Sequence, residues 1–129
     1  MTIQFAQIEP TTRCNFTCGF CTGRTMPQGD LSLDAFRAML ELHPHLEHIE
    51  LQGEGEPVLN KDFVPMLELA HQKGLRVSVI TNGSLLTQAV VDALLRLEVS
   101  SVHCSLESTS PTLFQEIRGG SFDKLKSGL

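Results

Sequence analysis

The stretch Cys14-Asn15-Phe16-Thr17-Cys18-Gly19-Phe20-Cys21 places three cysteines within eight residues, in a C-x3-C-x2-C arrangement. It follows a first apolar run, Ile3 to Ile8, and precedes a segment containing glycine and proline. Soft thiolates at this density favour an iron–sulfur cluster. A [4Fe–4S] cluster has four irons, so three thiolates leave one iron without a protein ligand. That iron is free to bind a small molecule, as the open position of a catalytic zinc site does.

Other chemistries of clustered cysteines remain open at this point. Cys18 and Cys21 alone form the C-x2-C pair of a redox dithiol, although Cys14 would then have no role. A zinc site needs a fourth ligand, for which the candidates are His43, His45 and His48. A disulfide framework is disfavoured, because the cysteines are clustered and nothing in the sequence indicates secretion.

Composition limits the class of protein further. The chain has 129 residues, of which 41% are hydrophobic and 19% charged, so we expect a single globular domain over residues 1–129. The net charge of −5 provides no basic surface for nucleic acid or an anionic membrane. We find no secretory signal at the N-terminus and no apolar run of membrane-spanning length. We therefore expect a cytoplasmic protein, in a compartment where thiols stay reduced.

Hydrophobic periodicity predicts four strands alternating with helices. The expected strands are Ile3–Glu9, Leu46–Gln52, Leu75–Thr81 and Val99–Leu106. The expected inner helix faces are Leu33, Phe36, Met39 and Leu40; Phe63, Met66, Leu67 and Ala70; and Val90, Ala93, Leu94 and Leu97. A last helical stretch begins near Pro111, is interrupted at Gly119-Gly120 and resumes over Phe122–Leu129. This alternation predicts the α/β class, with right-handed crossovers and a parallel sheet.

Local signals predict where some of these helices begin and end. Asn60 or Asp62 is expected to cap the second helix, and Thr87 to cap the third. Pro44 ends the first helix, and Gly74 suits the position just past the end of the second.

The unusual segments of the chain all follow a strand. These segments are the cysteine loop from Pro10 to Asp30, then Gly53–Pro57, Asn82-Gly83 and Glu107-Ser108. Because the carboxyl ends of parallel strands meet at one edge of the sheet, we expect all four segments to contribute to one site.

With these motifs in place, the sequence resembles the radical S-adenosylmethionine (SAM) superfamily. The family signature has the same cysteine spacing with an aromatic residue before the last cysteine, a position that Phe20 occupies. The resemblance implies that Cys14, Cys18 and Cys21 hold a [4Fe–4S] cluster and that the amino and carboxylate groups of SAM bind its fourth iron. It covers almost the whole chain, from about Ile3 onward.

The segment after the second strand resembles the family's "GGE" motif, which binds the SAM ammonium. Gly55, Glu56 and Pro57 match it, whereas Glu54 stands in place of the first glycine. An ammonium offers only hydrogen-bond donors, so backbone carbonyls and a carboxylate suit it. Taken alone, the same segment would be a solvated acidic turn.

The ends of the third and fourth strands also carry family-like motifs. Thr81 and Asn82 belong to a T-N-G sequence that is also common in ordinary turns. Ser105 and Glu107 resemble an S-x-D motif, with glutamate in place of aspartate. Strand alternation predicts that these two side chains share one face, suited to ribose hydroxyls or the SAM carboxylate, while Cys104 is expected to be simply buried.

The segment Arg118-Gly119-Gly120-Ser121-Phe122 resembles the "R-x-G-x-F" region of the subgroup with twitch or SPASM extensions. The resemblance implies that Arg118 pairs with the SAM carboxylate, which a guanidinium fork suits. An exposed arginine at a helix end is the alternative. His43, His45 and His48 surround Pro44 at a helix end and are expected to lie on the surface.

The family core has six βα units, whereas four are expected here. We therefore expect a partial parallel (β/α) barrel of the radical SAM type, and a chain that is either the N-terminal part of a core domain or a reduced relative. Such an open sheet leaves the fourth strand as an exposed edge, which favours association with a completing chain or another copy.

The resemblance implies a radical SAM enzyme that cleaves SAM reductively to a 5′-deoxyadenosyl radical, which abstracts hydrogen from a substrate. It further implies a one-electron donor such as flavodoxin or ferredoxin. The likeness to the twitch and SPASM subgroup favours peptide or cofactor maturation, but the substrate and the residues of the hydrogen abstraction are not indicated. The alternative is a non-catalytic iron–sulfur and SAM-binding or assembly module that needs a partner chain.

Overall fold

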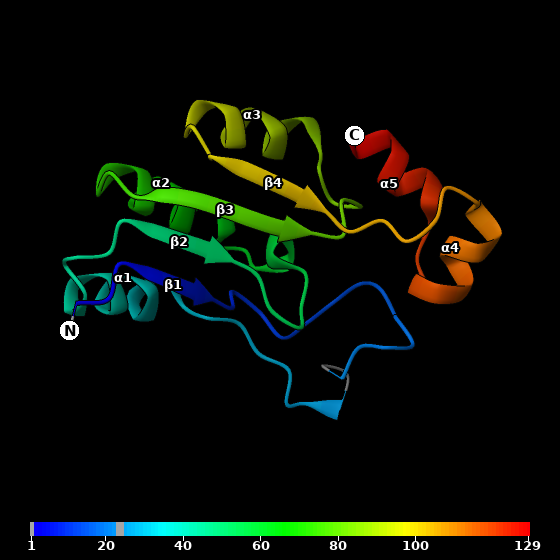
Figure 1. Cartoon of the computed structure of the whole chain (residues 1–129), viewed down its shortest axis with the longest axis horizontal. Coiled ribbons are helices and arrows are strands. Elements are labelled where there is room, and N and C mark those ends of the chain that lie inside the picture. The colour runs from blue at the N-terminus through cyan, green and yellow to red at the C-terminus, as the bar shows by residue number, and fades with distance from the viewer. Residues whose placement is uncertain (1, 23–24) are drawn as a thin grey trace.

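In the computed structural model, residues 2–22 and 25–129 are described (Figure 1). The elements are β1 (Phe5–Ile8), α1 (Leu33–Leu42), β2 (His48–Leu51), the 3-10 helix η2 (Pro57–Leu59), α2 (Phe63–Gln72), β3 (Arg76–Thr81), α3 (Gln88–Arg96), β4 (Ser101–Cys104), α4 (Pro111–Arg118) and α5 (Phe122–Gly128). The four strands form one parallel sheet in the order β1-β2-β3-β4. The predicted α/β class and parallel sheet are confirmed.

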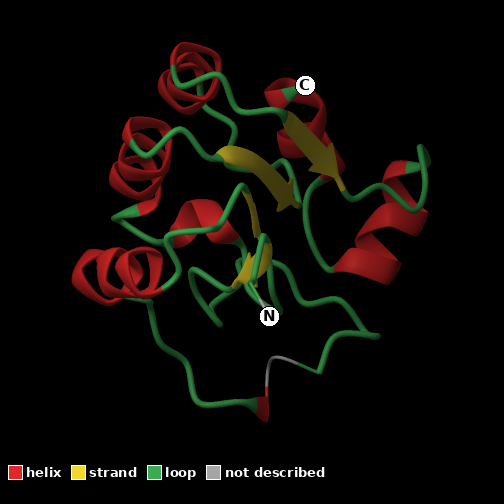
Figure 2. Ribbon diagram, turned by 60° about the vertical axis from the view of Figure 1, so that its left-hand side comes forward, coloured by secondary structure: helices red, strands yellow, loops and turns green. Residues whose placement is uncertain are grey.

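Helices α1, α2 and α3 cover one face of the sheet (Figures 1 and 2). The sheet contributes alternate apolar residues to this interface, and the register aligns Ile8 with Leu51 and Leu51 with Val79. Each helix adds its apolar stripe: Phe36 and Leu40 from α1, with comparable residues from α2 and α3. Burial of these side chains on both sides of the contact holds the helices on the sheet.

The helix ends follow the predicted local rules, with one exception. The Thr87 side chain accepts a hydrogen bond from the Val90 amide and caps α3, and Gly74 adopts φ +72° just after α2. Asp62 occupies the N-cap of α2 but makes no side-chain capping bond. Instead, the Asn60 side chain accepts a hydrogen bond from the Asp62 amide at 2.8 Å.

The strands are shorter than predicted, and β4 shows why this matters. It ends at Cys104 rather than Leu106, because β3 ends at Thr81 and offers no further partner. The Ser105 amide makes the last bond, to the Thr81 carbonyl at 3.0 Å. The prediction that Ser105 and Glu107 share one strand face is therefore wrong, since both lie beyond the strand.

A second, smaller core lies at the carboxyl end of the sheet, where α4 and α5 follow β4 (Figure 1). It consists of Phe16, Cys18, Phe114 and Leu125. The ring of Phe114 is fully buried and meets Phe16 edge-on at 5.9 Å between centroids, and Phe122 at 5.5 Å. The C-terminal helices thus pack against the cysteine loop. Within the described residues, no helix is both long and apolar enough to cross a membrane.

Candidate functional site

The three cysteines of the motif lie in the loop between β1 and α1 and line one cavity of about 400 Å³. Cys14 is exposed, Cys18 is buried and Cys21 is half-buried. The cavity is within the size range of small-molecule sites. It lies at the carboxyl ends of the strands, as predicted from the positions of the unusual segments.

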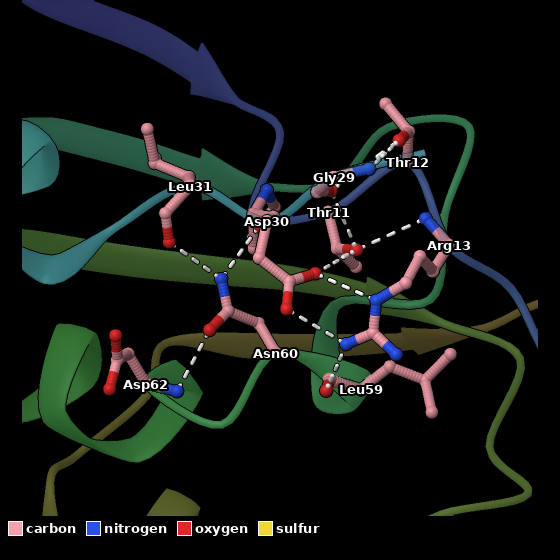
Figure 3. Close-up of polar contacts among 10 residues, drawn as sticks. Thr11, Thr12, Arg13, Gly29, Asp30, Leu31, Leu59, Asn60 and Asp62 are labelled. Carbon is pink, nitrogen blue, oxygen red and sulfur yellow. Dashed lines mark hydrogen bonds and ion pairs between the residues drawn. The ribbon is translucent and has the colours of Figure 1, made fainter. Parts of the chain in front are cut away.

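A polar network fastens the start and end of the cysteine loop to the segment after η2 (Figure 3). The Arg13 guanidinium donates to Asp30 through Nε and Nη2, both at 2.9 Å, and Nη2 also reaches the Leu59 carbonyl at 3.0 Å. The buried Thr11 hydroxyl donates to Asp30 at 2.6 Å. The hydrogen bond from Arg13 lowers the pKa of the Asp30 carboxyl. These contacts hold the ends of the loop together.

Asn60 completes this network from a buried position (Figure 3). Its side-chain amide donates to the Pro10 carbonyl at 2.7 Å and to the Leu31 carbonyl at 2.9 Å. One side chain therefore joins both ends of the cysteine loop to the start of α2. The sequence indicated Asn60 only as a helix cap, and no local signal linked Thr11, Arg13 and Asp30.

On its other side the cysteine loop contacts the end of α4. The Thr17 amide donates to the Arg118 carbonyl at 2.9 Å, and the Gly19 amide to the Ile117 carbonyl at 3.2 Å. Gly119 turns the chain there with φ +64°. A Cβ at Gly120 would overlap the Phe16 ring, so the Gly-Gly pair allows α4 to approach the loop.

The segment 53–57 lies against the start of the cysteine loop. The Glu56 amide donates to the Arg13 carbonyl at 2.8 Å, and a Cβ on Gly55 would overlap the carbonyl groups of Thr11 and Arg13. Gly55 therefore serves a close approach of two backbone segments. Pro57 is buried as the first residue of η2 and lies outside the cavity lining.

Glu56 lines the cavity, but the residue is only 2% exposed and its carboxylate points to the end of β3. It accepts hydrogen bonds from the Thr81 hydroxyl at 2.6 Å, the Asn82 amide at 2.7 Å and the Val58 amide at 3.3 Å. Burial raises its pKa, and the three donors oppose this shift. A carboxylate has about four acceptor positions, so it retains capacity for one more donor.

Asn82 connects β3 to the cysteine loop. Its side-chain nitrogen donates to Asn15 at 2.9 Å and lies 3.9 Å from the Cys14 sulfur, while its oxygen accepts from Ser84. Thr81 and Asn82 both line the cavity, as does Ser105. The structure thus brings these three predicted residues to the cysteines, although the Thr81 and Asn82 side chains are already bonded within the protein.

Arg118 lines the cavity and forms a bidentate ion pair with Glu107, which itself lies outside the lining. The hydrogen bond raises the pKa of Arg118 and lowers the pKa of Glu107. Phe20 is 63% exposed, and the Arg118 guanidinium lies 5.3 Å from its ring centroid. The third guanidinium nitrogen of Arg118, Nη1, faces the Cys18 sulfur at 3.8 Å.

Two minor expectations need correction. Cys104 is half-buried rather than buried, and it ends β4; burial, followed by the Glu56 charge, raises its pKa. His48 is not at a helix end but in β2, where it is half-buried and shares a hydrogen bond of 2.6 Å with Ser78. His45 is exposed and His43 half-buried. His43 lines a separate cavity with Leu46, Lys73 and Leu75, so it does not complete a zinc site with the cysteines.

Several cavity residues were not predicted individually as site residues, although seven of them lie in the cysteine loop or in the segment Gly53–Pro57, which were expected at the site. They are Thr12, Phe16, Thr17, Thr22, Gln28, Gln52, Gly53, Glu54 and Ile80. Glu54 contacts Cys21, with 3.1 Å between its carboxylate oxygen and the sulfur. Its position between Gly53 and Gly55 in the motif was the available signal. Gln52 directly follows β2, and Ile80 is the last residue but one of β3. The expectation that the carboxyl ends of the strands form the site was the available signal for these two residues.

The donor set fits an iron–sulfur cluster better than a single metal ion. No three His, Cys, Asp or Glu side chains in the described part of the chain are arranged to hold one ion. A cluster does not require that arrangement, because each thiolate binds a different iron. Three thiols that line one cavity supply the soft sulfur ligands that an iron–sulfur cluster requires.

Comparison with known proteins agrees with this geometry. Residues 8–129 match the family described as "Radical SAM superfamily". A tungsten-containing aldehyde ferredoxin oxidoreductase cofactor-modifying protein of Pyrococcus furiosus is 31% identical over an alignment of 110 positions that covers 81% of this chain and 31% of that protein. A GTP 3′,8-cyclase of Haemophilus influenzae is 31% identical over an alignment of 140 positions, gaps included, that covers 97% of this chain and 40% of that protein. The chain thus spans well under half of these curated relatives.

Solved structures show the same fold. Streptococcus suis SuiB bound to S-adenosylmethionine has a TM-score of 0.77 at 22% identity, covering 95% of this chain and 28% of that chain. SuiB bound to its precursor peptide SuiA gives a TM-score of 0.78. The architecture is therefore that of a partial radical SAM (β/α) barrel with four parallel strands. On the match over residues 8–129, this chain belongs to the radical SAM superfamily.

Proposed function

We propose that this chain is a radical SAM enzyme or the N-terminal part of one, in which Cys14, Cys18 and Cys21 hold a [4Fe–4S] cluster. The observation that carries the proposal is convergence on one cavity. The three thiols share its lining with the motif residues of three strand ends and with Arg118. Residues far apart in sequence thus contribute to a single site, since Cys14 and Arg118 are separated by 104 positions.

When bound, the cluster supplies one electron that cleaves SAM to methionine and a 5′-deoxyadenosyl radical, which takes a hydrogen atom from the substrate. The protein's own part is to orient SAM and exclude water. Cys18 packs in the apolar cluster with Phe16 and Phe114 and is 7% exposed, which would limit the access of water on this side of the cluster site. The remaining acceptor position of Glu56 and the carbonyls beside it suit the SAM ammonium.

The other predicted SAM contacts divide into two groups. Phe20, Gly55, Thr81, Asn82, Ser105 and Arg118 line the cavity and are proposed to contact SAM or to shape its site. Pro57 and Glu107 lie outside the lining and act indirectly: Pro57 begins η2, and Glu107 holds Arg118.

Anaerobic reconstitution followed by Mössbauer spectroscopy tests the cluster assignment. The wild-type chain should take up one [4Fe–4S] cluster, and the variant with Cys14, Cys18 and Cys21 all changed to alanine should take up none. Cys104→Ala is the matched control, because it removes a half-buried thiol outside the cavity lining. An equal cluster content in the triple variant would refute the assignment.

A non-catalytic binding or assembly module is the second candidate, favoured by the edge of the sheet. Within the described residues, β4 pairs only with β3, and its Val102 side chain is 39% exposed. An open edge of this kind suits a completing chain or a second copy. Reconstituted protein with SAM and dithionite separates the candidates: 5′-deoxyadenosine formation supports the enzyme, and its absence with an intact cluster supports the module.

The substrate class that we propose is a peptide or a cofactor undergoing maturation. The Pyrococcus furiosus relative is named as a cofactor-modifying protein, and SuiB was solved with its precursor peptide. An oxygen-sensitive cluster needs reducing surroundings, so we propose the cytoplasm as its compartment and a flavodoxin or ferredoxin as its one-electron donor.

A further inference from the structure

Arg118 has most of its hydrogen-bonding capacity committed within the protein. It is the last residue of α4, and its side chain is 11% exposed. Its Nε and Nη2 atoms both donate to the carboxylate of Glu107. This is the bidentate geometry that holds a guanidinium most firmly. The side chain is therefore fixed in direction before any ligand arrives.

The fixed guanidinium points its third nitrogen at a cysteine of the motif. Arg118 Nη1 lies 3.8 Å from the Cys18 sulfur, within the range of a hydrogen bond to sulfur. The Phe20 ring covers the guanidinium at 5.3 Å. Cys18 is 7% exposed and packs with Phe16 and Phe114. In such apolar surroundings a nearby positive charge acts strongly on a thiolate.

The three motif cysteines therefore have different neighbours. Cys18 faces a guanidinium, whereas the Cys21 sulfur lies 3.1 Å from a carboxylate oxygen of Glu54. Cys14 has a neutral amide nitrogen, from Asn82, at 3.9 Å. Among these three contacts, the one at Cys18 brings a positive charge to the sulfur.

We propose that Arg118, held by Glu107, donates a hydrogen bond to the Cys18 sulfur and thereby raises the reduction potential of the cluster. This inference rests on the proposed function, since it requires the cluster that Cys18 helps to bind. Reduction adds negative charge, and hydrogen bonds and positive charge at the sulfurs stabilise the reduced state. In this role Arg118 is a positioning residue for the cluster rather than the receptor of the SAM carboxylate that the family resemblance implies.

A redox titration of the reconstituted full chain without SAM, monitored by the EPR signal of the reduced cluster, tests the inference. Arg118→Met removes the charge and the donor and keeps a stem of similar width, so the midpoint potential should fall. Arg96→Met is the control: it also removes one positive charge, from a pair with Glu68 on the surface. The midpoint potential of Arg96→Met should stay at the wild-type value.

Arg118→Lys provides a second variant if Arg118→Met does not fold or does not hold a cluster. Lysine keeps the charge but has no planar fork to pair with Glu107 and reach Cys18 together. The midpoint potential of Arg118→Lys should fall, but by less than that of Arg118→Met. An unchanged potential in both variants, or in Arg118→Lys if that variant alone is reconstituted, would overturn the inference.

The outcome is separable from failure of the proposed function. If the wild-type chain takes up no cluster, the cluster assignment itself fails. If the cluster forms and Arg118→Met keeps the wild-type potential while SAM affinity falls tenfold or more, Arg118 binds SAM and only this inference is wrong.

Discussion

Replacing Gly55 by alanine tests whether the motif after β2 is built for contact with the cysteine loop. A Cβ at this position would lie 2.5 Å from the Arg13 carbonyl oxygen, 2.8 Å from the Thr11 carbonyl carbon and closer still to the Thr11 oxygen. These are backbone atoms, and they have little freedom to move. The Glu56 amide holds the Arg13 carbonyl at 2.8 Å, and the Thr11 hydroxyl holds the Arg13 amide at 3.0 Å.

The expected cost follows from these contacts. Overpacking of a close contact costs about 1–3 kcal/mol. Moving the loop away also weakens the hydrogen bond between Glu56 and Arg13, worth about 0.5–1.5 kcal/mol. We therefore expect Gly55→Ala to lower the free energy of unfolding by about 2–4 kcal/mol, a large part of the roughly 5–15 kcal/mol of a typical domain.

Urea unfolding of the cluster-free chain, followed by circular dichroism under reducing conditions, measures this cost. Gly29→Ala is the matched control, because a Cβ at Gly29 has no neighbour within 4 Å. The control should change the free energy of unfolding by less than about 1 kcal/mol. If Gly55→Ala unfolds at the same urea concentration as wild type, or if both variants shift alike, the close approach does not constrain this glycine.

Three further predictions concern the residues that support the site. Burial raises the pKa of Glu56, so the folded chain binds this proton more tightly than the unfolded chain. The contribution of this proton to the free energy of unfolding is complete below the ordinary glutamate pKa of about 4.3 and is lost as pH rises through the raised pKa of the folded state. The free energy of unfolding of wild type relative to Glu56→Gln should therefore fall over this range of pH, as measured by urea unfolding at stepped pH values. A difference between the two proteins that does not change with pH would contradict this prediction. Asn60→Ala removes the hydrogen bonds of this side chain to the Pro10 and Leu31 carbonyls and to the Asp62 amide, and it should cost about 2–3 kcal/mol by urea unfolding, whereas Arg13→Lys, at a partly exposed ion pair, should cost less than about 1 kcal/mol; equal costs would refute this ranking. Phe114→Ala removes a fully buried ring and should cost about 3–5 kcal/mol in thermal or urea unfolding, against less than about 1 kcal/mol for the exposed neighbour Leu113→Ala, and a similar small loss in both would show that the second core is not tightly packed.

The sequence alone determined the order of elements and the place of the site. Alternating apolar patterns, the capping residue Thr87 and the turn glycine Gly74 are local signals, and the structure confirms each of them. The parallel sheet then requires that the segments after the strands meet at one edge. Consequently, Cys14 and Ser105 were predicted at one site, and both line the same cavity.

What each predicted side chain contacts was decided only by the tertiary structure. Glu56 was predicted as a ligand-binding carboxylate, yet it is bonded to Thr81 and Asn82, 25 and 26 residues away. Arg118 was predicted to meet SAM, yet it pairs with Glu107 and faces Cys18, 100 residues away. Such contacts depend on how separate elements pack, and spacing along the chain carries no information on side-chain partners across that distance. The physical reason is that periodicity and capping report local backbone geometry, whereas burial and hydrogen bonding are properties of the assembled fold.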